Sequence, residues 1–190
     1  IERARPPFEV AAIEHKRVAS FGGVTVNARL DRMDRLMGMG GSGGAGRGGH
    51  AVIDYKTGNA SVGDWLGPRP DDPQLPFYAV SQDAAQEVCA VAFARVKAGD
   101  MEFKGVARDE GLIPGVKTLA GQRLQAARDY DSWDELLAGW RYELEALGKE
   151  FASGEARVDP KRGEQTCRYC DLTPLCRINE RSFSIGSEDE

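Results

Sequence analysis

Two acidic residues and a lysine in the first third of the chain have the types and spacing of groups that work together chemically. Asp31 follows an alternating segment, and Asp54 and Lys56 lie two residues apart at the end of the next one. Carboxylate oxygens are the ligands that Mg²⁺ prefers, and the ion keeps several water molecules in proteins. Because water on such an ion is a good nucleophile near neutral pH, we expect Asp31 and Asp54 to hold a divalent ion. Lys56 would then orient the water and stabilise the transition state.

The hydrophobic pattern places these residues on neighbouring strands. Strands are predicted at residues 8–18, 24–31 and 51–56, with a glycine-containing turn between the first two. Alternation in the second strand turns Asp31 to its polar face, where we expect the strand to end. Asp34 is the alternative ligand, but a strand that continued would turn it to the opposite face.

Further strands complete a predicted sheet. Residues 88–94 form a near-continuous apolar run, which is typical of a strand buried on both faces, and residues 101–106 follow as another strand. The glycine-rich residues 38–49 lack the Gly-Lys-Ser/Thr ending of a phosphate-binding loop and precede a strand. We therefore interpret them as a flexible hairpin connection.

Two helices are predicted beside these strands. The first begins at Asp71-Asp72-Pro73, with an aspartate at its N-cap and the proline in its first turn. Gln74 and Tyr78, four residues apart, would lie on one side of it. The second begins at a capping box formed by residues 132–135 and has an apolar stripe of Trp133, Leu136, Leu137, Trp140, Leu144, Leu147 and Phe151. The pattern predicts an α/β fold with a mixed central β-sheet flanked by helices.

Three cysteines near the C-terminus have the spacing of metal ligands. Cys167, Cys170 and Cys176 form a C-x₂-C-x₅-C motif, and thiolates at this spacing bind a soft metal ion or an iron–sulfur cluster. Cys89 is the only other cysteine, and its apolar surroundings favour a core residue over a fourth ligand. The thiolate site and the carboxylate site should therefore be chemically separate.

Three motifs in order resemble the PD-(D/E)XK nuclease superfamily, in particular its RecB and AddB branch. They are Leu30-Asp31-Arg32, then residues 53–58 (Ile-Asp-Tyr-Lys-Thr-Gly), then residues 74–79 (Gln-Leu-Pro-Phe-Tyr-Ala). The resemblance implies a restriction-endonuclease-like core over residues 1–180. It also implies that Asp31 and Asp54 bind Mg²⁺ or Mn²⁺, that Lys56 is the catalytic lysine, and that Gln74 and Tyr78 line the site.

The resemblance also implies a function. It predicts a metal-dependent deoxyribonuclease, an exonuclease acting on single-stranded DNA or DNA ends in repair and recombination, with a helicase or helicase-like subunit as partner. A catalytically weak or inactive DNA-end binding module is the alternative, and a small metal-binding interaction domain is a third interpretation. Relatives often carry an earlier acidic or histidine ligand, for which Glu2 and Glu14 are the candidates here.

For the cysteine trio, the resemblance implies a structural four-iron cluster completed by a cysteine further upstream. Zinc is the second choice of metal. Because the chain begins at Ile1 without a methionine, we expect a C-terminal fragment of a longer protein.

Bulk properties set wider limits. The net charge of −5 is unusual for a DNA-binding protein, although metal-binding carboxylates add to it. No secretory signal and no apolar run long enough to span a membrane is visible, so we expect a cytoplasmic protein. Residues 181–190 are predicted to be an acidic, disordered terminus.

Overall fold

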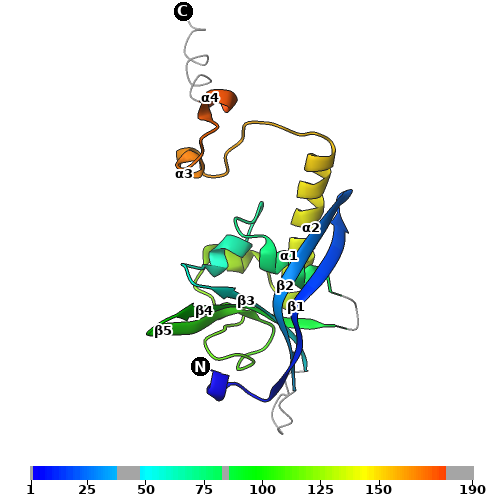
Figure 1. Cartoon of the computed structure of the whole chain (residues 1–190), viewed down its shortest axis with the longest axis vertical. Helices are drawn as coiled ribbons and strands as arrows, with labels where there is room; N and C mark the ends of the chain where they lie inside the picture. The colour runs from blue at the N-terminus through cyan, green and yellow to red at the C-terminus, as the bar shows by residue number, and fades with distance from the viewer. Residues whose placement is uncertain (1, 38–47, 83–85, 179–190) are drawn as a thin grey trace, which may run out of the picture. The chain divides into compact units, whose positions relative to one another are not determined.

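A five-stranded sheet forms the framework of the protein. The computed structural model describes residues 2–37, 48–82 and 86–178. The chain folds into two compact units, Ile1–Ala152 and Ser153–Glu190, and each is described by itself. The first unit contains the sheet (Figure 1), whose strands are β1 (Phe8–Phe21), β2 (Val24–Leu36), β3 (Gly49–Lys56), β4 (Val88–Lys97) and β5 (Asp100–Ala107).

The sheet is mixed, as the sequence predicts. Its strand order is β1-β2-β3-β4-β5, and only β3 and β4 run parallel to each other. Since parallel neighbours require a crossover connection, the chain leaves the sheet after β3 and returns to begin β4. This crossover contains η2 (Val62–Trp65) and α1 (Gln74–Val80). Residues 88–94 of β4 are all buried, which confirms the prediction of a strand covered on both faces.

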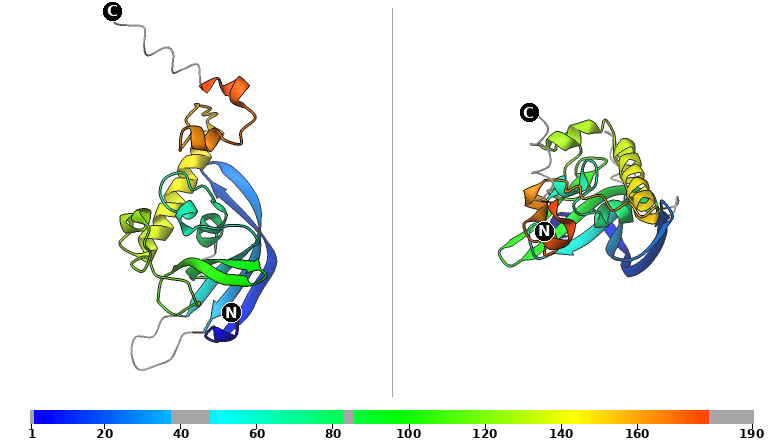
Figure 2. Two further views of the ribbon diagram at one scale, coloured as in Figure 1. Left: turned by 90° about the vertical axis from the view of Figure 1, so that its left-hand side faces the viewer. Right: turned by 90° about the horizontal axis from the view of Figure 1, so that it is seen from above.

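Two helices pack on one face of the sheet. α1 and α2 (Trp133–Ala152) lie side by side there (Figures 1 and 2) and close the larger hydrophobic core. The indole N–H of Trp133 donates to the carbonyl of Val88 at 2.9 Å, and that of Trp140 donates to the carbonyl of Trp65 at 2.8 Å. Both indoles are therefore buried without an unsatisfied donor, and α2 is tied to the start of β4 and to η2.

Loop residues cover the other face of the sheet. Leu112, Ile113 and Val116, from the segment after β5, pack on Ala51 and Ile53 of β3 in a second, smaller core. The N-terminal segment, which includes η1 (Glu2–Ala4), leads into β1, whose first residue, Phe8, extends this cover. The crossover covers one face of β3, and the segment after β5 covers the other. This explains why both faces of that strand are apolar up to Asp54.

The prediction that β2 ends at Asp31 is wrong. β2 continues to Leu36, and Asp34, the alternative metal ligand, lies on the opposite face and is completely buried. Its carboxylate lies 2.7 Å from the guanidinium of Arg5 and 2.7 Å from Nε of Arg32. Because these two cations compensate its charge, the strand can carry Asp34 into the interior.

The helix boundaries also differ from the predictions. α1 begins at Gln74 with Pro73 as its N-cap, and Asp72 accepts a hydrogen bond from the Gln74 amide at 3.2 Å. In the capping box of α2, Ser132 accepts from the Glu135 amide as predicted, but the Glu135 carboxylate accepts from Asp131. At the end of the predicted apolar stripe, Phe151 is 78% exposed.

The remaining segments are short or lie outside the described residues. The predicted hairpin connection falls mainly on residues 38–47, which the structure does not describe, and β2 and β3 on either side of it pair antiparallel. The predicted acidic terminus, residues 181–190, also lies outside. The first unit further contains η3 (Gln125–Asp129), and the second contains α3 (Glu164–Cys167) and α4 (Thr173–Cys176). No helix in the described part of the chain is long and apolar enough to cross a bilayer.

The turn between β1 and β2 touches α2 through glycines on both sides. A Cβ on Gly148 of α2 would lie 2.1 Å from the carbonyl oxygen of Phe21, and a Cβ on Gly22 would lie 2.2 Å from the Lys149 amide nitrogen. The Gly22 amide also donates to the Glu145 carboxylate at 2.7 Å. This contact fixes the far end of the β1–β2 hairpin to the helix.

We predict that Gly148→Ala lowers stability, although alanine normally favours a helix by about 1 kcal/mol over glycine. The clash with the Phe21 carbonyl should outweigh this gain and cost about 1–3 kcal/mol, as overpacking does. Chemical denaturation of both proteins measures the difference. Gly58→Ala is the matched control, because nothing lies within 4 Å of a Cβ there. A Gly148→Ala protein as stable as the wild type would contradict the close approach.

Candidate active site

β3 carries the central pair of the candidate site. Asp54 and Lys56 lie on the face of the sheet that α1 covers, because alternate residues of a strand share a face. The Asp54 side chain is almost completely buried, whereas Lys56 is partly exposed. Their charged groups form an ion pair, with 2.9 Å between Lys56 Nζ and Asp54 Oδ2. The pair lies at the C-terminal end of β3, where the strand is no longer buried.

Asp31 stands opposite Asp54 at the point where β2 separates from β3. The backbone pairing of these strands runs from Leu36–Gly49 to Arg32–Ile53, and the same register places Asp31 across from Asp54. There the Tyr55 amide donates to Asp31 Oδ2 at 3.0 Å. The side-chain carboxylate thus takes the place that a backbone carbonyl would have in a continuing ladder, and this holds Asp31 beside Asp54.

α1 adds Gln74 and Tyr78 to the site. Lys56 Nζ donates to the side-chain oxygen of Gln74 at 3.2 Å, and the Gln74 side-chain nitrogen donates to the Tyr78 hydroxyl at 3.4 Å. The Tyr78 hydroxyl in turn donates to the backbone carbonyl of Arg29 in β2. A chain of hydrogen bonds therefore connects Lys56 to β2 through α1. All five residues predicted for the site lie together.

Asp72 is a further neighbour, whose position in the sequence predicts only a helix cap. Its Oδ2 lies 3.7 Å from Lys56 Nζ, while its Oδ1 accepts from the Gln74 amide. It therefore restrains both Lys56 and Gln74. Asp72 lies two residues before Gln74, which could indicate a place near the site. A carboxylate just before a helix is usually a cap, however, so the spacing alone does not predict a role in the site.

The electrostatics of the site are dominated by excess negative charge. Burial raises the pKa of Asp54, and the carboxylates of Asp31 and Asp72 raise it further, beyond what the ion pair with Lys56 offsets. Burial alone would lower the pKa of Lys56, but its hydrogen bond and charge interaction with Asp54, helped by Asp72, raise it. With all groups ionised, three carboxylates face one ammonium group, which leaves two negative charges in excess.

This arrangement fits a hard divalent cation. Asp54 Oδ2 is buried, and its contact among the residues that the structure describes is the ion pair with Lys56 at 2.9 Å. Within the same described residues, no three His, Cys, Asp or Glu side chains gather as a complete metal site. Two protein carboxylates with water and substrate oxygens completing the shell is the usual coordination of Mg²⁺.

The alternative acidic ligands have other partners. Asp34 lies on the opposite face of the sheet, in its buried ion pair with Arg5. Glu2 pairs with Arg5 and Arg32, and Glu14 pairs with Arg29 at 2.9 Å on the surface. None of these carboxylates joins Asp31 and Asp54 in the structure.

The cysteines do not form a metal centre in this structure. None of the four is in a disulfide, and Cys167, Cys170 and Cys176, at least partly exposed, do not meet as a three-ligand group among the described residues. The structure therefore does not support the predicted iron–sulfur cluster. Cys89 is a core residue as expected: its thiol lies 3.5 Å from the carbonyl of His50, and burial raises its pKa to about 11.

Comparison with known proteins identifies the family. The family model of the PD-(D/E)XK nuclease superfamily matches residues 1–177. The chain belongs to the PD-(D/E)XK nuclease superfamily. Members of this superfamily are generally nucleases that use divalent metal ions, and the mixed sheet with flanking helices agrees with a restriction-endonuclease-like fold. A search of curated proteins gave no match.

We predict that Asp54→Asn stabilises the metal-free protein near neutral pH. The pKa of Asp54 is raised in the folded state, so folding favours its protonated form. Its contribution to stability is therefore present at low pH and is lost as the pH rises through the folded-state pKa. In EDTA the variant should melt at a higher temperature than the wild type at neutral pH, and the difference should shrink toward pH 3.8, the ordinary pKa of the group.

Asp34→Asn is the matched control for this experiment. It breaks a completely buried ion pair and leaves the half-exposed Glu2 as the carboxylate next to Arg5; breaking a buried pair typically costs about 3–5 kcal/mol. The two substitutions should therefore change the melting temperature in opposite directions. A lower melting temperature for Asp54→Asn at neutral pH would contradict the excess of negative charge at the site.

Proposed function

We propose that this PD-(D/E)XK protein is a metal-dependent nuclease that hydrolyses phosphodiester bonds in DNA. One observation carries the proposal: Asp31 and Asp54 face each other across two strands, with Lys56 paired to Asp54 on the same face. By this proposal Asp31 and Asp54 hold Mg²⁺ or Mn²⁺. When bound, such an ion supplies an activated water and offsets negative charge that develops on the phosphate.

The residues of the chain have distinct roles in this mechanism. In the metal-free protein, the hydrogen bond and charge interaction with Asp54 raise the pKa of Lys56, which favours its charged form. Lys56 would orient the attacking water and stabilise the charge on the phosphate. Gln74 fixes the direction of the ammonium group from α1, and Tyr78 anchors Gln74 to β2 through the Arg29 carbonyl.

The finer features of the function are also proposals. The motif order supports a RecB- or AddB-like exonuclease that acts on single-stranded DNA or DNA ends during repair and recombination. A helicase or helicase-like subunit would then supply the strand. Degradation of linear but not circular single-stranded DNA would support the exonuclease mode, whereas cleavage of both at equal rates would contradict it.

We predict that Lys56→Ala keeps metal binding but loses most of the rate. Removal of one such electrostatic group typically costs about 10²- to 10³-fold. Mn²⁺ binding is measured by isothermal titration, and cleavage is measured on labelled DNA with Mg²⁺. Asp54→Ala is the comparison, because loss of a charged ligand should abolish both metal binding and cleavage. Undiminished cleavage by the Asp54→Ala protein would contradict the proposed function.

The cysteine trio provides a separate prediction. If Cys167, Cys170 and Cys176 bind a metal ion or cluster in the whole protein, that site should stabilise the fold without taking part in catalysis. Iron, sulfide and zinc are quantified after anaerobic purification, and melting temperatures are compared for the wild type and Cys170→Ser. Absence of all three elements, together with an unchanged melting temperature, would reject this role.

A further inference from the structure

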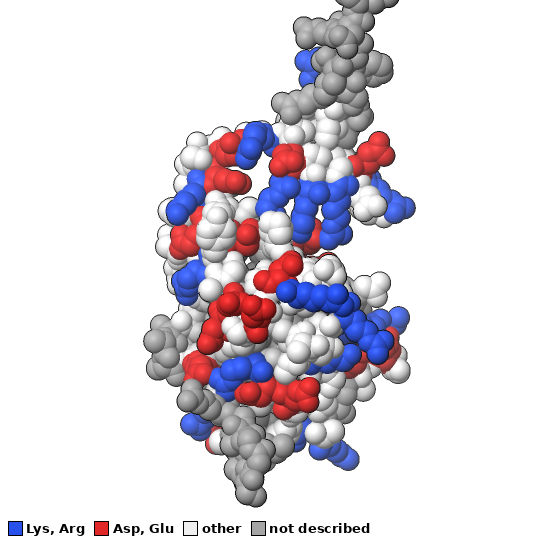
Figure 3. All heavy atoms as spheres, turned by 180° about the vertical axis from the view of Figure 1, so that it is seen from behind, with Lys and Arg blue, Asp and Glu red and all other residues white. Residues whose placement is uncertain are grey.

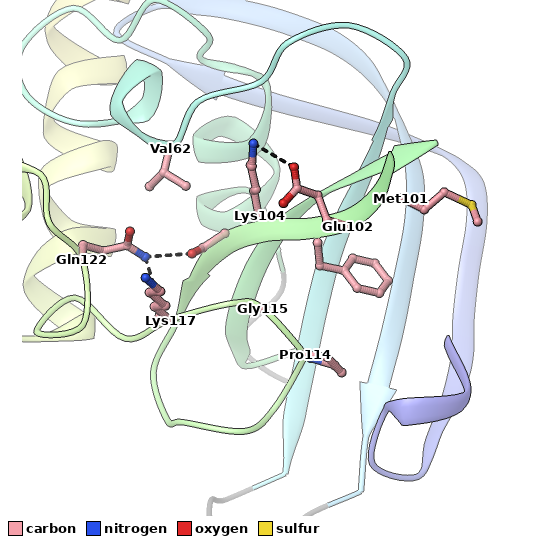
Figure 4. A pocket seen from close by; sticks show the side chains of 10 residues that line it. Val62, Met101, Glu102, Lys104, Pro114, Gly115, Lys117 and Gln122 are labelled. Carbon is pink, nitrogen blue, oxygen red and sulfur yellow. Dashed lines mark hydrogen bonds and ion pairs between the residues drawn. The ribbon is translucent and has the colours of Figure 1, made fainter. Parts of the chain in front are cut away.

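A groove at the outer edge of the sheet lies beside the candidate active site. It encloses about 510 Å³ along β5 and is lined by residues from three parts of the chain. Lys104 of β5 and Val62 of η2 lie on one side, and Pro114 lies on the other (Figure 4). Gln122 and Lys117, from the segment after β5, complete the wall. None of the five predicted site residues lines this groove.

The strand register connects the groove to the site. Asp54 of β3 pairs with Phe93 of β4, and Phe93 pairs with Lys104 of β5, so all three lie in one row across the sheet. Neighbouring strands are about 4.8 Å apart, which places Lys104 about 10 Å from Asp54 along this row. Side chains directly across neighbouring strands lie on the same face.

A second row provides an accessible path between the two places. Lys56 pairs in register with Arg95, and Arg95 pairs with Glu102. Phe93 itself is covered by Trp65, with 4.5 Å between the ring centroids, so a ligand cannot pass directly over it. The charged groups of Lys56, Arg95 and Glu102, which form the second row, remain partly exposed instead. A nucleotide strand that leaves the site would pass over these charged groups to reach Lys104.

The groove has a positive charge in an acidic protein. Two lysines, Lys104 and Lys117, and one glutamate, Glu102, line it, which gives a local charge of +1 against −5 for the whole chain. Figure 3 shows that basic and acidic side chains are interspersed on the face it draws, with no single broad basic surface. A local cationic groove is therefore a better candidate for phosphate contact than the mixed surface that Figure 3 shows.

The walls of the groove are held by hydrogen bonds. The Gln122 side-chain nitrogen donates to the Gly105 carbonyl at 2.9 Å and to the Lys117 carbonyl at 3.4 Å, which joins the segment after β5 to the strand. Val62 and Pro114 add apolar surface for a sugar or a base. Lys104 Nζ lies 2.9 Å from the Glu102 carboxylate, which also pairs with Arg95.

We propose that this groove binds a backbone phosphate of the DNA strand whose neighbouring phosphodiester bond lies at Asp31 and Asp54. This inference rests on the proposed nuclease function and assigns a second contact to the same strand. Lys104 and Lys117 bind the phosphate, and the path over Arg95 sets its distance from the cleaved bond. In the free protein, Lys104 forms an ion pair with the Glu102 carboxylate, and the phosphate replaces this carboxylate when DNA binds.

Binding of a single-stranded oligonucleotide tests the proposal. Fluorescence anisotropy is measured in EDTA with the Asp54→Asn protein, so that cleavage does not consume the labelled DNA. Lys104→Ala combined with Lys117→Ala should weaken binding and flatten the dependence of log K on log salt concentration. The expected change in slope is about 0.7 for each phosphate contact that is lost on a single strand. Lys149→Ala, an exposed lysine on α2, should leave the slope unchanged.

Glu102→Gln gives a result of the opposite sign. It removes the anion that competes with the phosphate for Lys104, so binding should become about two- to fivefold tighter, the range expected for an exposed ion pair. Weaker binding by this variant would overturn the proposed exchange between Glu102 and phosphate.

Cleavage by the wild type, measured in parallel, separates the two levels of the proposal. If the wild type cleaves DNA but the double lysine variant binds with the same affinity and salt slope, the second contact is wrong and the nuclease stands. If the wild type does not cleave DNA and the Asp54→Asn protein does not bind it, both are wrong. Cleavage by the wild type with a flatter slope only in the lysine variants supports both.

Discussion

The burial of the Asp54 carboxylate beside the Asp31 carboxylate is the constraint on which the rest of the site depends. A buried charge costs free energy unless a partner compensates it, and two like charges increase that cost. Lys56 supplies one partner from the same strand face, and α1 holds this lysine through Gln74. Because the parallel pairing of β3 and β4 requires a crossover, the connection that the topology demands also supplies the helix that completes the site.

Much of this could be predicted from sequence because the relevant signals are local. Alternation in β3 places Asp54 and Lys56 on one face, and a spacing of four places Gln74 and Tyr78 on one side of a helix. The apolar run in β4 likewise predicts an interior strand. These patterns depend only on the repeat of the backbone, so they do not require knowledge of the partners.

The features that could not be predicted depend on contacts between distant segments. Asp34 is a candidate metal ligand in the sequence, and the strand is predicted to end before it, because Arg5, which compensates its charge in the interior, comes from the distant N-terminal segment. Asp72 looks like a helix cap until the fold brings it to Lys56. Phe151 fits the apolar stripe of α2, but α2 extends beyond the surface that it covers, and the ring remains exposed. In each case the missing information is the partner, not the propensity of the residue.

The five site residues all come from residues 31–78, a single continuous stretch that includes the crossover helix. The lysines of the β5 groove come from outside this stretch. Because the groups proposed for chemistry lie in this one segment, substitutions in the segments after β4 can alter the lysines of the groove without changing that segment. Under the proposed function, such substitutions would change how DNA is bound without altering the cluster around Asp54.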